Sequence, residues 1–218
     1  MERNRAIKNV IFDIGNVLVG LRLDEFSRDL FGDNTDVWKR VYNAVWASGL
    51  WDELDRGIIP EEEVLQRMVD HDPEMKDEIC QVWDHAGEIA YRTEHAIPWI
   101  KAVKESGYRT FFLSNYSYRM MYANRKALDF LPLMDGGVFS CDVKLIKPDL
   151  RIYRTLLDKY RLDPAECLFI DDREENTRAA EEVGISTLSC TGFAQVQRDA
   201  GKILGLECEI YGSEDILQ

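Results

Sequence analysis

The chain has 218 residues, 45% of them hydrophobic, which favours one α/β domain with a large insertion or two small domains. Forty acidic against 27 basic residues give a net charge of −13, which repels nucleic acids and anionic membranes, so we expect neither as a partner. The first residues lack the apolar region of a secretory signal, and no apolar run reaches transmembrane length. The five scattered cysteines favour a reducing cytoplasm. We expect a monomer or a homodimer there.

The predicted strands are short apolar blocks bounded by polar residues. They cover residues 7–14, 110–113, 138–139, 167–170 and 186–188. Helical patterns separate most of them: one spans 93–107, one begins at Pro148, and one spans 174–183. This alternation of strand and helix predicts an α/β fold with a Rossmann-like parallel sheet.

The segment from 21 to 92 interrupts this alternation because its apolar residues repeat at helical spacing throughout. It also holds four of the five tryptophans, namely Trp38, Trp46, Trp51 and Trp83. A helical insertion after the first strand lies beside the carboxyl ends of the strands, where open α/β sheets bind ligands. We therefore expect a core domain formed by 1–20 and 93–218, with a helical cap domain formed by 21–92.

Polar residues stand where successive predicted strands end. They are Asp13 in Phe-Asp-Ile-Gly-Asn-Val-Leu-Val, Ser114 in Phe-Leu-Ser-Asn, Lys147 in Lys-Leu-Ile-Lys-Pro, and Asp171 and Asp172 in Leu-Phe-Ile-Asp-Asp-Arg. Each alone is typical of a turn or a helix cap. All of them in order along a parallel sheet predict one shared crevice, because the carboxyl ends of parallel strands meet at one edge.

This ordered set resembles the haloacid dehalogenase superfamily, and the resemblance extends from Val10 to about Leu188. It implies a phosphatase in which Asp13 attacks phosphorus and forms an aspartyl-phosphate that water then hydrolyses. It also implies Mg²⁺ as cofactor, held by the carboxylates of Asp13 and Asp172 and the carbonyl of Gly15, with Asp171 as a supporting acid.

The same resemblance assigns residues to the phosphorylated small-molecule substrate. Ser114 and the Asn115 amide are expected to bind its phosphate, and Lys147 to neutralise charge between phosphate and nucleophile. Two arginines of the cap segment are weaker candidates. Arg22 is placed where it can reach over the phosphate and Arg56 where it can touch the substrate from above, although a solvated helix face is the favoured explanation for each.

One position departs from the family pattern. Phosphatases of the superfamily usually carry a second Asp two residues after the nucleophile, as acid for the leaving group and base for water, but Gly15 stands there. General acid–base catalysis is commonly worth about a hundredfold to ten-thousandfold. The Gly-Asn pair is nevertheless similar to a bacterial α-glucose-1-phosphate phosphatase branch of the superfamily, so a sugar 1-phosphate is a natural substrate to consider.

Two other functions stay open. A 2-haloacid dehalogenase uses the same aspartate to attack carbon without a metal, but the pair Asp171 and Asp172 facing Asp13 would then lack a cation. A non-catalytic protein that only binds a phosphorylated ligand would have no need of the nucleophile. The combination of residues therefore favours a phosphatase.

Overall fold

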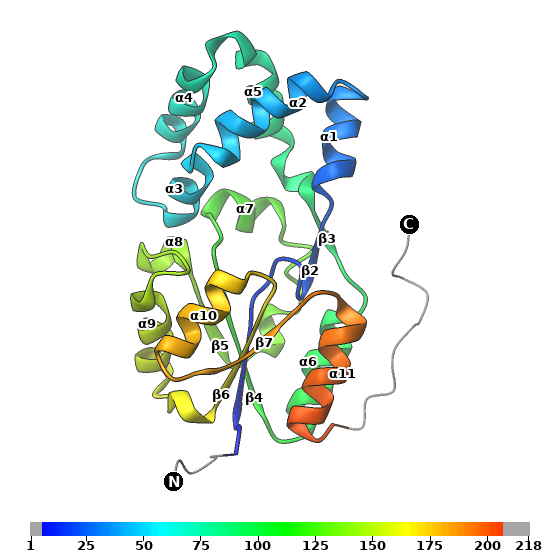
Figure 1. Ribbon diagram of the computed structural model, residues 1–218, viewed down its shortest axis with the longest axis vertical. Helices are drawn as coiled ribbons and strands as arrows, with labels where there is room; N and C mark the ends of the chain where they lie inside the picture. The colour runs from blue at the N-terminus through cyan, green and yellow to red at the C-terminus, as the bar shows by residue number, and fades with distance from the viewer. Residues whose placement is uncertain (1–5, 207–218) are drawn as a thin grey trace.

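Buried apolar strands build the sheet at the centre of the molecule (Figure 1). The computed structural model describes residues 6–206, so Cys208 lies outside the described part. The strands are β1 (Asn9–Phe12), β4 (Arg109–Ser114), β5 (Gly136–Phe139), β6 (Cys167–Asp171) and β7 (Ser186–Ser189). They run parallel in the order β5-β4-β1-β6-β7, which confirms the predicted α/β class.

Helices cover both faces of this sheet, as its uninterrupted apolar strands require. α6 (Ala96–Glu105) and α11 (Phe193–Leu204) pack on the face that contains Val10 and Phe12. α9 (Leu150–Tyr160) and α10 (Glu174–Glu182) pack on the other face, against Ile11. The helix predicted from Pro148 begins two residues later, because the Asp149 carboxylate accepts the Arg151 N–H and caps it there.

A helical unit, defined here as residues 23–89, stands beyond the carboxyl ends of the strands (Figure 1). Its elements are α1 (Leu23–Phe31), α2 (Thr35–Tyr42), the π-helical turn Asn43–Ala47, α3 (Leu50–Arg56), α4 (Glu61–His71), the 3₁₀ turn Pro73–Met75, α5 (Lys76–His85) and the 3₁₀ turn Ala86–Ile89. Phe26, Val41, Val64, Met68 and Ile79 are fully buried inside it. The predicted helical character of the insertion is thus present.

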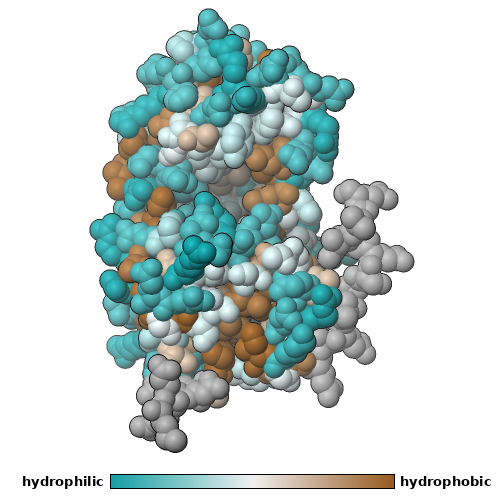
Figure 2. All heavy atoms as spheres, in the orientation of Figure 1, coloured by the Kyte–Doolittle hydropathy of each residue, from teal (hydrophilic) through white to brown (hydrophobic). Residues whose placement is uncertain are grey.

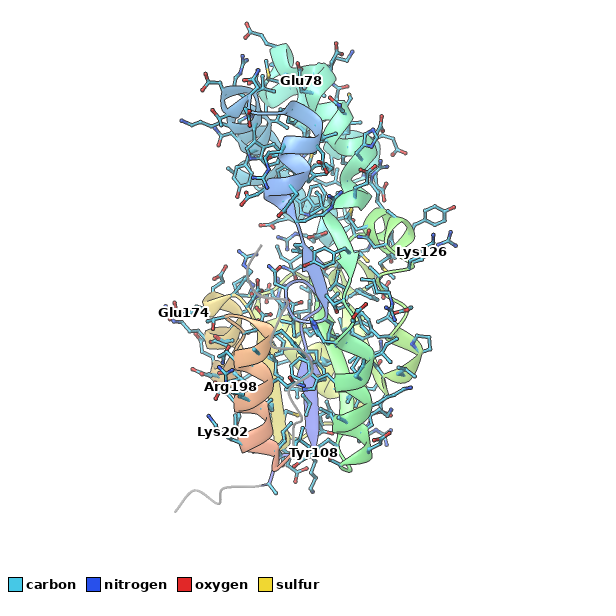
Figure 3. The ribbon with its side chains drawn as sticks, turned by 90° about the vertical axis from the view of Figure 1, so that its right-hand side faces the viewer. Glu78, Tyr108, Lys126, Glu174, Arg198 and Lys202 are labelled. Atoms are coloured by element: carbon cyan, nitrogen blue, oxygen red, sulfur yellow. The ribbon has the colours of Figure 1, made fainter. Side chains whose placement is uncertain are left out.

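Two short strands that the sequence analysis missed join this unit to the sheet. β2 (Val19–Leu21) and β3 (Ala90–Arg92) pair antiparallel, and in Figure 3 they form the neck of the molecule. Three residues per strand are too few to show a periodic pattern, which is why the helical segment predicted from 21 to 92 included β3 and the end of β2. The neck brings both ends of the helical unit back to one place.

Short elements complete the surface under the helical unit. They are α7 (Tyr118–Ala123), the 3₁₀ turn Leu131–Leu133, α8 (Ser140–Val143) and the 3₁₀ turn Pro164–Glu166. Figure 2 shows a hollow between the helical unit and the sheet domain, on the face that α10 borders. Within residues 6–206, no helix is both long enough and apolar enough to cross a membrane.

Candidate active site

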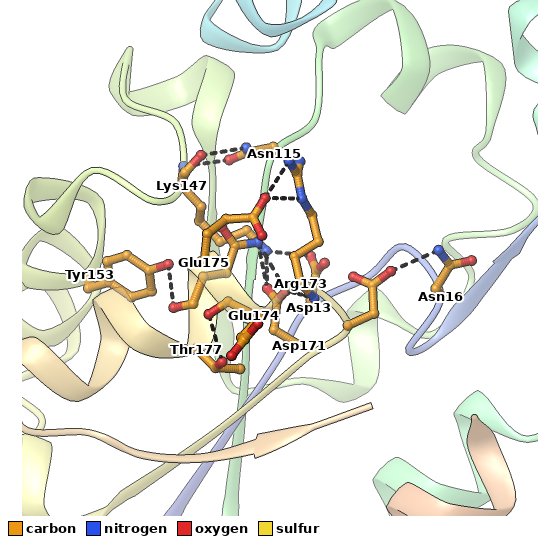
Figure 4. Close-up of polar contacts among 12 residues, drawn as sticks. Asp13, Asn16, Asn115, Lys147, Tyr153, Asp171, Arg173, Glu174, Glu175 and Thr177 are labelled. Atoms are coloured by element: carbon orange, nitrogen blue, oxygen red, sulfur yellow. Dashed lines mark hydrogen bonds and ion pairs between the residues drawn. The ribbon is translucent and has the colours of Figure 1, made fainter. Parts of the chain in front are cut away.

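The ends of the central strands bring the predicted residues to one buried place (Figure 4). Asp13 directly follows β1, Ser114 ends β4 and Asp171 ends β6, and the parallel register aligns these three strands. The sequence suggested that Lys147 also ends a strand, but Lys147 lies in the loop between α8 and α9. The exposed fractions are 7% for Asp13, 2% for Ser114, 3% for Lys147 and 0% for Asp171.

Lys147 lies between two carboxylates. Its Nζ is 2.8 Å from Asp13 Oδ1 and 2.6 Å from Asp171 Oδ2. Burial lowers the pKa of Lys147, but the charges of the two aspartates outweigh burial and the net pKa is raised. Burial raises the pKa of Asp13 to about 6 against the opposing effect of Lys147. Lys147 is therefore a fixed cation, and Asp13 is kept ionisable near neutral pH by it.

Asp13 Oδ1 combines burial with an open coordination position. Lys147 Nζ approaches it at ion-pair distance, yet this oxygen has no hydrogen bond of acceptable angle within residues 6–206. A buried carboxylate oxygen without a hydrogen bond is costly unless a ligand or a reacting group uses it. This geometry fits both metal ligation and nucleophilic attack by Asp13.

Asp171 holds Lys147 in place. Its Oδ1 accepts the backbone N–H of Arg173 at 2.9 Å and the amide of Asn176 at 3.0 Å. Its Oδ2 accepts Lys147 Nζ at 2.6 Å and the same Asn176 amide at 3.1 Å. These four contacts use the acceptor positions of both oxygens. In this arrangement Asp171 acts on the position of Lys147, and its supporting part in the metal site stays a prediction.

Three carboxylates could share a metal ion. Oxygen atoms of Asp13, Asp171 and Asp172 lie within 4.8 Å of one another. Burial raises the pKa of Asp172, and its Oδ2 accepts the Asn16 amide at 2.9 Å. Hard oxygen ligands of this kind fit Mg²⁺. Since Asp171 is already saturated, Asp13 and Asp172 with the adjacent Gly15 carbonyl are the best candidate ligands.

Asn115 pins the loop that carries Lys147. Its amide Nδ2 donates to the Lys147 carbonyl at 3.1 Å, and its Oδ1 accepts the Lys147 N–H at 2.8 Å. The side chain of Asn115 is therefore occupied in positioning Lys147. Ser114 and Lys147 lie at the carboxyl end of the sheet with Asp13, and phosphate binding by Asn115 stays a prediction that its main-chain N–H could meet.

The Arg22 guanidinium contacts the helical unit, and its binding of substrate stays a prediction. Its guanidinium donates to the Glu88 carbonyl at 2.8 Å and pairs with Asp29 at 3.0 Å. Both partners belong to the helical unit, and the position of Arg22 in the sequence does not predict either contact. Arg56 is half-buried and lies 3.5 Å from Glu53 on its own helix.

Sequence reasoning missed a buried acid beside Arg56. Asp55, in the last turn of α3, is 7% exposed. Burial raises its pKa to about 8, Asp52 and Asp13 add to the rise, and the Ser117 N–H and Lys147 oppose it. The only signal in the sequence was its place between buried Leu54 and the helix-ending Gly57, a pattern that many surface acids share.

The family profile of haloacid dehalogenase-like hydrolases matches residues 7–184. The chain belongs to this family. It is 29% identical over 116 residues to mouse bifunctional epoxide hydrolase 2, covering 49% of the chain and 20% of that protein. The chain thus spans about a fifth of the length of these mammalian relatives.

Other relatives of this family member match at different lengths. A sesquiterpene phosphatase of Aspergillus oryzae is 24% identical over 200 residues, which cover 92% of the chain and 98% of that protein. An (S)-2-haloacid dehalogenase of Burkholderia cepacia is 29% identical over 103 residues, or 45% of each protein.

A solved structure shares the fold of this family member. The Bacteroides thetaiotaomicron enzyme of the same family superposes with a TM-score of 0.67 at 22% identity, covering 85% of this chain and 94% of that chain. A second structure of that enzyme, with a TM-score of 0.64, is a complex with magnesium and inorganic phosphate.

Proposed function

We propose that this hydrolase is a Mg²⁺-dependent phosphatase that acts on a small phosphorylated metabolite through an aspartyl-phosphate on Asp13. The observation that carries the proposal is the buried contact of Asp13 with Lys147, whose Nζ lies 2.8 Å from Asp13 Oδ1. The carboxylates of Asp171 and Asp172 lie beside this contact. A cation fixed against the nucleophile suits a dianionic substrate, since both the phosphate and the attacking carboxylate are negative. The relative named as a phosphatase and the related enzyme crystallised with magnesium and phosphate support it.

Each residue has a distinct task in this proposal. The Asp13 carboxylate attacks phosphorus in line with the departing oxygen, and water later attacks the phosphorus of the aspartyl-phosphate and releases Asp13. Lys147 Nζ lowers the repulsion between carboxylate and phosphate. Asp171 and Asn115 hold Lys147 in position. Ser114 donates to a phosphate oxygen. Asp13, Asp172 and the Gly15 carbonyl would hold Mg²⁺, which would supply further positive charge at the phosphate.

We assign the helical unit the role of a cap, within a domain of residues 21–92 on a core of 1–20 and 93–218. It stands over the hollow of Figure 2, so it can exclude bulk water and contact the leaving group. The Gly-Asn pair after the nucleophile supports the sugar 1-phosphate branch. The acidic net charge and free thiols at Cys141, Cys167 and Cys190 support a cytoplasmic enzyme, monomeric or dimeric, without a nucleic-acid or membrane partner.

A dehalogenase reaction is the second candidate, favoured by the Burkholderia match. Two further carboxylates lie within 4.8 Å of Asp13. Lys147 offsets only one of these three negative charges, so a divalent cation suits the cluster, whereas a metal-free attack on carbon has no use for the remaining charge. Chelation separates the two reactions: EDTA should abolish phosphate release and would leave halide release from a 2-haloacid unchanged.

Purified protein should be assayed with p-nitrophenyl phosphate and a panel of sugar phosphates in the presence of Mg²⁺. We expect phosphate release that Asp13→Asn and EDTA both abolish. Absence of turnover on every phosphate monoester, with the wild-type protein folded and Mg²⁺ present, would overturn the phosphatase proposal. Phosphate binding without turnover would instead favour a ligand-binding protein of the same fold.

A further inference from the structure

The reaction proposed above needs a proton donor that the loop after β1 does not provide. An alkoxide is a poor leaving group, so hydrolysis of an alkyl phosphate is faster when an acid protonates the departing oxygen. Gly15 has no side chain at the position where relatives carry an acid. An in-line attack by Asp13 from the sheet places the leaving group on the opposite side of phosphorus, toward the helical unit. The missing donor is therefore best sought there.

α3 is the helix that docks the helical unit onto the site loop. The Ser140 hydroxyl donates to the Asp55 carbonyl at 2.6 Å and accepts the Tyr116 N–H at 2.8 Å. Lys144 Nζ donates to the Gly57 carbonyl at 2.6 Å. Tyr116 is two residues beyond Ser114, so these bonds fix the end of α3 against the loop that carries the predicted phosphate ligand. In Figure 1, α3 lies directly above α8.

The docking bonds use main-chain carbonyls of α3 and leave the carboxyl group of Asp55 free for another task. That group is buried and is close enough to the Ser117 N–H to be influenced by it. Asp13 and Lys147 both influence its pKa, and the Ser140 bonds hold this end of α3 against the loop that follows Ser114. Burial holds its pKa near 8, so at neutral pH the carboxyl carries a proton.

We propose that Asp55 is the general acid and base of this enzyme, supplied by the helical unit in place of the acid missing at Gly15. The inference rests on the proposed phosphatase function. As the phosphorus–oxygen bond to the leaving group breaks and the bond to Asp13 forms, the Asp55 proton passes to the departing oxygen. In the second step the Asp55 carboxylate takes a proton from the attacking water, phosphate leaves Asp13, and both aspartates return to their starting states.

The test compares two classes of substrate in Asp55→Asn. A primary alkyl phosphate needs a proton for its leaving oxygen, whereas p-nitrophenolate departs without one. We expect kcat/KM to fall by about a hundredfold or more for the alkyl phosphate and by less than about tenfold for p-nitrophenyl phosphate. Asp33→Asn, which removes one exposed charge from the same unit, is the matched control and should leave both rates unchanged.

A second variant moves the acid to the position that relatives use. Gly15 does not have a positive φ, and a Cβ there would meet only the Leu21 side chain at 3.4 Å, so Gly15→Asp fits the backbone. In the Asp55→Asn background it should restore turnover of the alkyl phosphate. Such a rescue would distinguish proton donation from a structural role of Asp55, because an acid on another loop can donate a proton but cannot replace the packing of Asp55.

The outcomes separate the inference from the proposed function. Equal losses of kcat/KM for the alkyl and aryl substrates would overturn the role of Asp55 while leaving the phosphatase intact. No turnover of any monoester by the wild type would remove the phosphatase itself. If Asp55→Asn does not fold, the wild-type protein can be assayed with a series of substrates that differ in leaving-group basicity. We expect kcat/KM to depend only weakly on that basicity, and a strong dependence would overturn the inference.

Discussion

The buried carboxyl of Asp55 makes a prediction about stability that does not depend on catalysis. In the unfolded chain Asp55 titrates at its ordinary value of 3.8, whereas burial raises its pKa to about 8 in the folded protein. Between these values the folded state keeps a proton that the unfolded state has released. The stability that Asp55 contributes is therefore fully present below pH 3.8 and is lost as the pH rises toward 8.

Replacing Asp55 by Asn removes this loss, because the amide stays neutral at every pH. The free energy of unfolding of Asp55→Asn relative to the wild type should then increase by about 1.4 kcal/mol for each pH unit between the two pKa values. From pH 5.5 to pH 7.5 the expected gain is about 2.7 kcal/mol. The variant should therefore gain stability relative to the wild type as the pH rises toward neutrality, even though it loses alkyl phosphatase activity.

Urea denaturation in EDTA, followed by tryptophan fluorescence, measures this difference at pH 5.5, 6.5 and 7.5. Asp33→Asn serves as control for the change in net charge, and its stability should stay parallel to that of the wild type. A difference between Asp55→Asn and wild type that stays constant with pH would refute the reasoning. It would mean that Asp55 ionises equally in the folded and unfolded chains.

Three further substitutions test the site itself. Asp13→Asn should abolish turnover and leave the circular dichroism spectrum unchanged, because the amide keeps the size of the side chain but is no nucleophile; near-wild-type activity would remove Asp13 from the mechanism. Asp172→Ala should raise the Mg²⁺ concentration for half-maximal activity, and an unchanged requirement would place the cation elsewhere. Lys147→Met should cost roughly 3–5 kcal/mol of unfolding free energy at pH 8, since it leaves Asp13 and Asp171 buried without their cation, and the cost should shrink at pH 5; a cost that does not change with pH would contradict this account.

Much of the core could be predicted from the sequence because its signals are local. The apolar blocks around Val10, Phe111 and Phe169 are short and regularly separated by helices, and only a parallel sheet accommodates that order. The sheet in turn requires that residues after β1, β4 and β6 meet at one edge. Asp13, Ser114 and Asp171 therefore could be assigned to one crevice before any coordinates were known.

The contacts that refine the site could not be predicted in the same way. Arg22 stands next to the first motif, but whether its guanidinium reaches the crevice or Glu88 depends on the path of a chain segment 66 residues away. Asn115 has the right place for a phosphate ligand, yet its side chain is used by the Lys147 backbone. Side-chain partners of this kind come from long-range packing, which periodicity does not encode.

Asp55 shows most clearly what each level of information decides. The sequence determined the alternation of strands and helices, the helical insertion and the absence of an acid at Gly15, because these depend on residue type and spacing along the chain. Only the tertiary structure decided that α3 docks on the loop after β4 and buries this one carboxyl among many exposed acids. Burial is a property of the surroundings of a residue and is the largest cause of the raised pKa of Asp55, so the proton affinity of this acid is set mainly by the fold.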